Sequence, residues 1–175
     1  MTFDVVVAAD RSWGIGNAGA LPWPRLRADM QHFKRVTTTT TDPARRNAVV
    51  MGRKTWESKE VAGKPLPNRR NVVVSRRGDL TLPEGVVLAP SLDAALASAG
   101  DVETIFVVGG AELYRLAFEH PALRWVYLTR IDATYDCDTH IPDLSARGFR
   151  RDPAWADEQE REDNGVRYRI ERWMP

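Results

Sequence analysis

Short apolar runs, many of them rich in β-branched residues, alternate along this chain with segments whose apolar residues have helical spacing. The runs predict strands, and those that are apolar throughout are typical of buried strands in a parallel sheet. Asn164-Gly165 separates the last two runs and is a strong hairpin signal. The predicted strands cover Phe3–Ala9, Asn47–Met51, Asn71–Ser75, Val86–Leu88, Thr104–Val108, Trp125–Ile131 and two hairpin arms around Trp155–Arg161 and Val166–Trp173.

Helices are predicted between most of these strands, and the threonine-rich run Thr37–Thr41 is expected to be a loop. Because strands and helices alternate and the chain closes in a hairpin, we expect one α/β domain over residues 1–175. It should hold a mainly parallel twisted sheet of about eight strands, a C-terminal antiparallel hairpin and about four flanking helices. The predicted helices run from about Arg25 to Val36, onward from Gly52, from the capping residue Ser91 through Leu96, and onward from Gly109-Gly110.

Asp29 lies in the first predicted helix, three residues after Leu26 and four before Phe33. With Met30, those two residues define an apolar face, so the Asp29 carboxylate points into the same stripe. A carboxylate is costly to bury unless a partner pairs with it, and a ligand with N–H donors is such a partner. The pattern alone leaves open the alternative that Asp29 faces solvent, where the helix macrodipole favours an acid in the first turns.

The run from Gly14 to Gly19 matches GxGxxG and follows a strand, as a dinucleotide-binding fingerprint does. That fingerprint also requires a helix that begins at the glycines, and here Pro22 and Pro24 delay the helix. The acid expected after the second strand is missing as well, because Gly52 follows that strand. We therefore interpret the run as a flexible loop whose glycines permit positive φ and which can lie over a cofactor.

Basic residues follow two strands at the sheet edge where parallel sheets usually bind ligands. Arg53, Lys54 and Thr55 come after one strand, and Ser75-Arg76-Arg77 ends the next. Cations and hydroxyls beside a helix start suit a phosphate, although two ordinary surface basic pairs remain the alternative. Gly109-Gly110 lets the backbone approach a ligand at a third strand end, and a tight packing turn would require glycines equally.

Composition narrows the class of protein. The hydrophobic fraction of 43% suits a globular domain, and a net charge of +1 gives no general attraction to nucleic acid or anionic membranes. Cys137 is the one cysteine, and His32, His120 and His140 have no metal-binding spacing, so we expect no metal and ordinary surface or partly buried histidines. The sequence shows neither signal-peptide nor membrane-helix features, and we expect a cytoplasmic monomer.

Several stretches keep one order and spacing over nearly the whole chain, to about Pro142. They are Gly14-Ile15-Gly16, Leu21-Pro22-Trp23, Asp29, Phe33-Lys34, Met51–Ser58, Pro65-Leu66-Pro67, Arg69, Asn71, Val108-Gly109-Gly110, Tyr114, Leu128–Ile131 and Asp138-Thr139. Together they resemble the dihydrofolate reductase family. No single stretch would suffice, but chance agreement of all of them is remote.

The resemblance implies an NADPH-dependent reduction of 7,8-dihydrofolate to 5,6,7,8-tetrahydrofolate, with hydride transfer to pterin C6 and protonation of N5, in support of one-carbon metabolism. It implies that Asp29 is the active-site acid, which accepts hydrogen bonds from the pterin 2-amino group and N3 and promotes N5 protonation. Thr129 matches the threonine that hydrogen-bonds this acid, and Trp23 matches the tryptophan that helps hold an ordered water. Antifolate-type inhibitors are implied as further ligands.

The resemblance also assigns binding residues, among which Arg69 would pair with the α-carboxylate of the folate glutamate. Basic residues would hold the 2′-phosphate of NADPH, and no acid is expected there to hold a free 2′-hydroxyl. The substrate-binding residues implied are Val6, Val7, Asp29, Phe33, Lys59, Leu66, Arg69, Val108, Tyr114 and Thr129. The cofactor-binding residues implied are Ala8, Ile15, Gly16, Gly19, Leu21, Gly52, Arg53, Lys54, Thr55, Ser75, Arg76, Val108, Gly109, Gly110, Ala111, Glu112, Leu113 and Tyr114.

Some positions depart from the family pattern. Lys59 stands where an aliphatic residue usually packs on the benzoyl ring of the substrate, and its stem can still cover that ring. Asn68 replaces a frequent glycine and tolerates the left-handed region. Glu112 replaces a basic residue of some bacterial members. The resemblance further implies cis peptide bonds at Gly109-Gly110 and before Pro65.

Two other functions compete with this interpretation. A related reductase of riboflavin synthesis shares the fold and NADPH but lacks the Pro-Trp loop with the helix acid and Arg69. A non-catalytic nucleotide- or RNA-binding domain would use the arginines, but clustered aromatic residues between the basic ones are lacking, and Asp29 would have no role.

Overall fold

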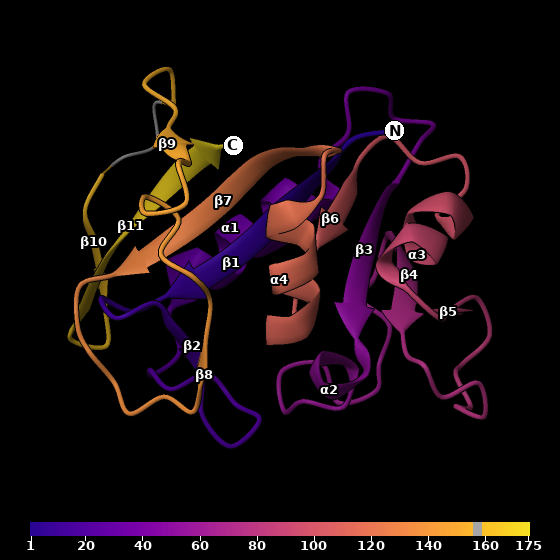
Figure 1. Ribbon diagram of the computed structural model, residues 1–175, viewed down its shortest axis with the longest axis horizontal. Coiled ribbons are helices and arrows are strands. Elements are labelled where there is room, and N and C mark those ends of the chain that lie inside the picture. Colours follow the sequence, from indigo (N-terminus) through magenta and orange to yellow (C-terminus); the bar gives the residue numbers. More distant parts are fainter. Residues whose placement is uncertain (156–158) are drawn as a thin grey trace.

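The computed structural model describes residues 1–155 and 159–175, and within them nine strands form one sheet (Figure 1). The strand order is β10-β11-β7-β1-β6-β3-β4-β5, with β9 paired to β11. Pairs from β7 to β5 along this order are parallel, and the pairs made by β11 are antiparallel. The strands are β1 (Phe3–Ala9), β3 (Asn47–Gly52), β4 (Arg69–Val74), β5 (Val87–Ala89), β6 (Ile105–Val107), β7 (Leu123–Ile131), β9 (Arg150–Arg151), β10 (Arg161–Asp163) and β11 (Val166–Met174).

Helices cover both faces of this sheet, which confirms the predicted α/β class. They are α1 (Arg27–Thr38), α2 (Arg53–Trp56), α3 (Leu92–Ser98) and α4 (Ala111–Glu119). Figure 1 shows α3 and α4 in front of the sheet and α1 behind it. One core cluster accordingly joins Val5 and Val7 to α3 and α4, and another joins Val6 to Phe33 and Val36 of α1. This division follows from the alternation of side chains along β1.

The C-terminal hairpin has the predicted turn. Asn164 and Gly165 have φ of 50° and 76°, the positive values that both central residues of a type I′ turn require. The first arm is shorter than predicted, because β10 begins at Arg161 and residues 156–158 of the expected run lie outside the described part of the chain. β9 was not predicted, since two exposed arginines carry no strand pattern.

Two element boundaries differ from the prediction in ways that matter for the site. Thr37 and Thr38 belong to α1, and their hydroxyls donate to the carbonyls of Phe33 and Lys34 one turn earlier at 2.7 and 2.6 Å. β4 begins at Arg69 rather than at Asn71, which places the arginine inside the sheet. A helix long and apolar enough to cross a membrane does not occur among the described residues.

Candidate active site

Asp29 and Thr129 form the polar centre of the candidate site. Asp29 projects from α1, Thr129 lies on β7, and the threonine hydroxyl donates to Asp29 Oδ1 at 2.5 Å. Thr129 is buried, while Asp29 keeps partial exposure. Burial raises the pKa of the Asp29 carboxyl, and the Thr129 hydrogen bond and the charge of Arg161 act against this rise. The result is a carboxyl with raised proton affinity that one hydroxyl holds in place.

The apolar face of α1 differs partly from the prediction. Leu26 is buried and Phe33 is half-buried, but Met30 is 48% exposed and so does not belong to this face. His32, expected at or near the surface, is buried instead. Asp29 follows Leu26 by three residues and precedes Phe33 by four, which puts it on the inner side of the helix. The solvent-facing alternative for Asp29 is therefore wrong.

Apolar residues on the α1 face of the sheet pack together beside Asp29. Val6, Phe33, Leu66 and Val108, all predicted to contact substrate, belong to one cluster built around Val49, Met51, Trp56, Val73 and Phe106. Tyr114 lies on the other face of the sheet, and its hydroxyl reaches the Val6 carbonyl at 2.8 Å. Burial raises the pKa of the Tyr114 hydroxyl, which therefore stays a neutral donor.

Val7 has a different position from its neighbour. Its side chain packs in the core on the α3 and α4 face, so only its backbone is available to a ligand beside Val6. Trp23, by contrast, is buried next to Leu26 and meets the ring of Tyr135 edge-on at 6.0 Å between centroids. The tryptophan thereby anchors the segment that enters α1.

Arg69 is a buried guanidinium that side-chain and backbone oxygens orient. Its Nε donates to the Pro67 carbonyl at 2.9 Å, and its Nη1 donates to the Thr37 hydroxyl at 2.9 Å. Burial lowers the pKa of Arg69, and among the described residues no carboxylate forms an ion pair with it. Such a cation is suited to an anionic ligand. Sequence reasoning missed Thr37, because a threonine run carries no helix signal.

Asn71, Lys59 and Asn68 differ in how firmly the structure places them. Asn71 fixes the backbone of Leu66, because its side chain accepts from the Leu66 N–H and donates to the Leu66 carbonyl, both at 2.9 Å. Lys59 is exposed, so its contact with a substrate depends on the stem of the side chain alone. Asn68 has φ of 62°, the left-handed conformation expected for it.

The glycine-rich loop is more ordered than the sequence suggested. Gly14 and Gly16 lie in β2 (Gly14–Gly16), which pairs with β8 (Thr139–His140), and among the three glycines of the motif only Gly19 has positive φ. Gly14 is needed for space, because a Cβ there would lie 2.4 Å from Cys137 Sγ. Ile15 and Gly16 remain half-buried, and Leu21 is 48% exposed.

Asp10 holds this loop, and sequence reasoning missed it. Its carboxylate accepts hydrogen bonds from the backbone N–H groups of Ser12, Gly14 and Tyr135 at 2.9, 2.8 and 2.8 Å. Burial by itself would raise the pKa of Asp10, but these three bonds outweigh it and lower the pKa. The loop after β1 and the loop after β7 are thus tied together at one buried acid.

The turn after β6 consists of two glycines, so no side chain covers its backbone. Gly109-Gly110 is the cis peptide bond among the described residues, as the resemblance implies, and Gly109 has φ of 135°. A Cβ on Gly109 would lie 3.0 Å from Thr55 Oγ1, and the Gly109 carbonyl accepts from Gly52 N–H at 2.8 Å. The bond before Pro65 is trans, so that expectation was wrong; trans is the common form of such bonds.

The helix that follows this turn has a glycine at its N-cap. The N-cap residue of α4, Gly110, has no side-chain hydrogen bond to offer. The first N–H groups of α4, at Ala111 and Glu112, therefore lack a side-chain acceptor from the cap, while Leu113 packs into the core. A diphosphate fits such a turn, because glycine backbone can approach it closely and N–H groups can donate to it.

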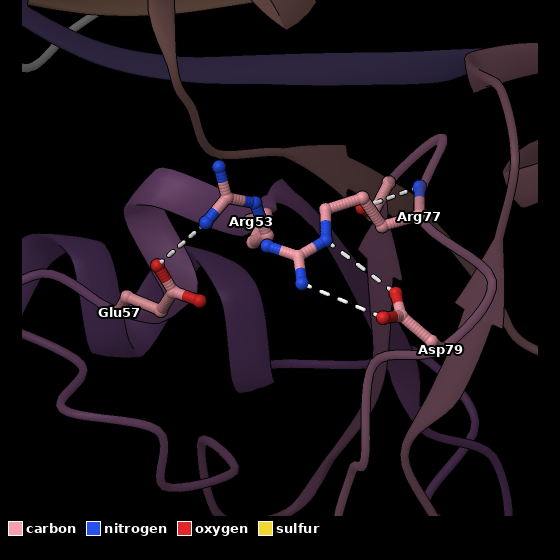
Figure 2. Close-up of polar contacts among 5 residues, drawn as sticks. Arg53, Glu57, Arg77 and Asp79 are labelled. Carbon is pink, nitrogen blue, oxygen red and sulfur yellow. Dashed lines mark hydrogen bonds and ion pairs between the residues drawn. The ribbon is translucent and has the colours of Figure 1, made fainter.

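Two ion pairs occupy the predicted phosphate region (Figure 2). Arg53 Nη1 lies 3.0 Å from Glu57 Oε2, and Arg77 Nε lies 3.4 Å from Asp79 Oδ1. The Arg77 N–H donates to Ser75 Oγ at 3.1 Å. Lys54 and Arg76 are exposed. These pairs are exposed to solvent, so each is weak enough to exchange its acid for a ligand phosphate.

This arrangement corrects two expectations. Acids do lie in the region, but both bond to arginines instead of standing free for a ribose hydroxyl. α2 is a single turn of four residues, so side chains rather than a helix terminus must supply most of the attraction for a phosphate. Within the described residues, His, Cys, Asp and Glu side chains form no group of three or more that could hold a metal.

Comparisons with known proteins agree with this geometry. The chain matches the dihydrofolate reductase family over residues 2–174. It is 40% identical to the dihydrofolate reductase of Drosophila melanogaster, with 81% of this chain and 80% of that protein covered. The solved structure of Schistosoma mansoni dihydrofolate reductase superposes with a TM-score of 0.84 at 35% identity, covering 99% of this chain and 98% of that one.

Some relatives are much longer. The bifunctional dihydrofolate reductase-thymidylate synthase of Daucus carota is 45% identical over 175 residues, which cover 95% of this chain and 32% of that protein. This chain therefore spans about a third of the length of these plant relatives.

Proposed function

Because the chain belongs to the dihydrofolate reductase family, a family of NADPH-dependent oxidoreductases, we propose that it reduces 7,8-dihydrofolate to 5,6,7,8-tetrahydrofolate. The observation that carries the proposal is the hydrogen-bonded Asp29–Thr129 pair, whose acid lies on the same helix as Phe33 of the apolar cluster. A half-buried acid with a raised pKa is costly to keep unless it serves a ligand.

Asp29 recognises the pterin and supports its protonation. When ionised, its carboxylate can accept hydrogen bonds from the 2-amino group and N3 of the ring. The Thr129 bond fixes one carboxyl oxygen and leaves the other available. Because its pKa is raised, the Asp29 carboxyl binds a proton more readily than an ordinary aspartate does, as a general acid requires, and Asp29 so promotes protonation of N5. Val6 and Phe33 line the pterin pocket with apolar side chains, and Trp23 helps hold an ordered water there.

Arg69 holds the other end of the substrate. Its guanidinium is oriented by the Thr37 hydroxyl and the Pro67 carbonyl, and a folate α-carboxylate would supply the negative charge that no described residue provides. A planar fork of donors matches a carboxylate. Leu66, positioned by Asn71, packs on the same apolar cluster as Val6 and Phe33.

The cofactor site is formed by the strand-end loops. NADPH, when bound, supplies the hydride. Gly109-Gly110 and the uncapped start of α4 suit its diphosphate, and the arginines near Ser75 suit its 2′-phosphate. The residues proposed to hold it are Ala8, Ile15, Gly16, Gly19, Leu21, Gly52, Arg53, Lys54, Thr55, Ser75, Arg76, Val108, Gly109, Gly110, Ala111, Glu112, Leu113 and Tyr114.

The direct test is loss of nicotinamide absorbance when the protein is mixed with NADPH and dihydrofolate. We expect turnover with dihydrofolate and none with a ribosylamino-pyrimidine, the substrate of the related riboflavin-pathway reductase. Turnover of the pyrimidine alone would assign the protein to that reaction, and turnover of neither would favour a binding domain. We also propose that the domain acts as a monomer and binds antifolate-type inhibitors competitively with dihydrofolate.

A further inference from the structure

The C-terminal hairpin, rather than the helix itself, caps the start of α1. The N-cap residue Leu26 makes no side-chain hydrogen bond. Instead, Asp163 Oδ2 on β10 accepts the Ala28 N–H at 3.1 Å, and Asn164 Nδ2 donates to the Arg25 carbonyl at 2.5 Å. A residue 135 positions away in the sequence therefore does what an Asp or Ser at the N-cap does in most helices.

A buried tyrosine fixes the Asp163 carboxylate. The Tyr168 hydroxyl on β11 donates to the same oxygen, Oδ2, at 2.5 Å. Tyr168 is completely buried and packs with Trp23 and Leu26. Burial, followed by the bond to Asp163, raises the pKa of Tyr168, so this hydroxyl remains protonated and keeps donating. The carboxylate oxygen is thus held from the helix side and from the core side.

Asp29 is the residue directly after Ala28, so the same turn carries the catalytic candidate. Its carboxyl faces Thr129 from β7, Arg161 and Asp163 from β10 and Tyr168 from β11. Burial raises the pKa of Asp29 most; Thr129 and Arg161 lower it, and the negative charge of Asp163 raises it further. The Asp163 oxygen that caps the turn is therefore also a like charge for Asp29.

We propose that Asp163 is a positioning residue for the reaction: from the C-terminal hairpin it sets the place of Asp29 and the electrostatic field at that carboxyl. The proposal rests on the proposed function for its catalytic consequence. Its structural core, a contact between β10 and the first turn of α1, stands on the three hydrogen bonds of Asp163 and Asn164.

Asp163→Asn separates charge from hydrogen bonding. One oxygen, Oδ2, accepts both bonds, and an amide oxygen with two lone pairs can accept both as well. The variant should keep the cap and lose only the charge. We expect the Asp29 carboxyl, followed by carbon-13 NMR and assigned with Asp29→Asn, to titrate lower by roughly 0.5 unit or more. The pH profile of single-turnover dihydrofolate reduction should shift to acid by the same amount, with the KM for NADPH unchanged.

Glu162→Gln is the matched control. Glu162 carries the same charge on the same strand, but its carboxylate is exposed and lies 3.9 Å from Arg167 Nε. It should leave both the Asp29 titration and the pH profile at their wild-type positions. Asp163→Ala should add a several-fold loss of kcat to the shift seen in Asp163→Asn, because the cap is then missing as well.

The outcomes separate the two proposals. An unshifted Asp29 titration in folded Asp163→Asn, or an equal shift in Glu162→Gln, would overturn the positioning role. A wild-type protein that does not reduce dihydrofolate would overturn the proposed function, while the NMR titration would still decide whether Asp163 acts on Asp29.

Discussion

The Thr129 hydroxyl donates to Asp29 Oδ1 at 2.5 Å, a bond that joins residues 100 positions apart. It ties the first helix to a strand at the antiparallel side of the sheet, and it leaves one oxygen of the acid for a ligand. Thr129 sits between Ala8 of β1 and Ile170 of β11 in the sheet, so the backbone on both sides fixes its place. Strand pairing on both sides therefore holds the Thr129 hydroxyl in place toward Asp29.

Asp29→Asn should slow dihydrofolate reduction by about two or more orders of magnitude, the scale of general acid–base effects. The amide keeps the shape and can accept the Thr129 bond, but it provides no proton. Single-turnover rates measured with NADPH in excess test this, and the KM for NADPH serves as the internal control. Near wild-type turnover at neutral pH would remove Asp29 from the mechanism.

The same substitution should stabilise the ligand-free protein at neutral pH. The folded pKa of Asp29 is raised above the ordinary value of 3.8, mainly by burial, so its contribution to stability is fully present below that value. It is lost as pH rises through the folded pKa, because the buried group must then ionise. The difference in free energy of unfolding between Asp29→Asn and wild type should grow as pH rises from the ordinary pKa to the folded pKa, and it should then level off. A difference independent of pH would contradict the burial argument.

The sequence allowed prediction of what is encoded within one element. Local spacing and residue type determine the strand positions, the Ser91 cap and the Asn164-Gly165 turn. The Ser91 hydroxyl accepts the Ala94 N–H at 3.1 Å, as a cap does. The inward direction of Asp29 was open from spacing, and the resemblance decided it. The family pattern also brought together positions such as Val6, Leu66 and Val108 that share no local signal.

Contacts that depend on two distant segments could not be predicted. In the sequence, nothing distinguishes Asp10 from an ordinary loop acid. Its role depends on the Tyr135 N–H, which lies 125 positions later and donates to it. Thr37 orients the guanidinium of Arg69, a contact that depends on the position of β4 relative to α1. Met30 was expected inside because it is apolar, but on α1 it lies just beyond the buried side. Tertiary geometry, not propensity, decides each of these cases.

Arg69→Leu should weaken dihydrofolate binding by about 2–5 kcal/mol, the usual cost of leaving one partner of a charge pair alone. A pterin without the glutamate tail should bind as before. Thr37→Val, which removes only the hydroxyl that orients the guanidinium, should weaken binding by a smaller amount. Fluorescence titration with both ligands measures this, and an equal loss for both would make Arg69 structural.

Asp10→Asn should destabilise the loop that carries Gly14 and Gly16. One carboxylate oxygen becomes an NH₂ group that cannot accept, so at least one of the three buried or partly buried N–H donors is left unpaired at about 1–3 kcal/mol. Because the folded pKa of Asp10 is lowered, its contribution is present above the ordinary value of 3.8 and is lost as pH falls through the folded pKa. Urea unfolding at several pH values tests this, with the exposed Asp136→Asn as control; a cost that persists at the lowest pH would contradict it.

Cofactor choice should depend on the arginines at the ends of β3 and β4. NADPH differs from NADH only by its 2′-phosphate, and each charge-assisted contact to that group should contribute about 1.5–3 kcal/mol, or roughly tenfold or more in affinity. Arg53→Ala combined with Arg76→Ala should therefore raise the KM for NADPH and leave that for NADH nearly unchanged.

The NADPH preference should also shrink with added salt, because Arg76 is exposed and the Arg53 side chain is 32% exposed. Arg115→Ala is the matched control, since Arg115 of α4 pairs with Glu119 four residues later, as Arg53 of α2 does with Glu57. Equal losses for NADPH and NADH in the double variant would mean that these arginines support the fold and that the phosphate binds elsewhere.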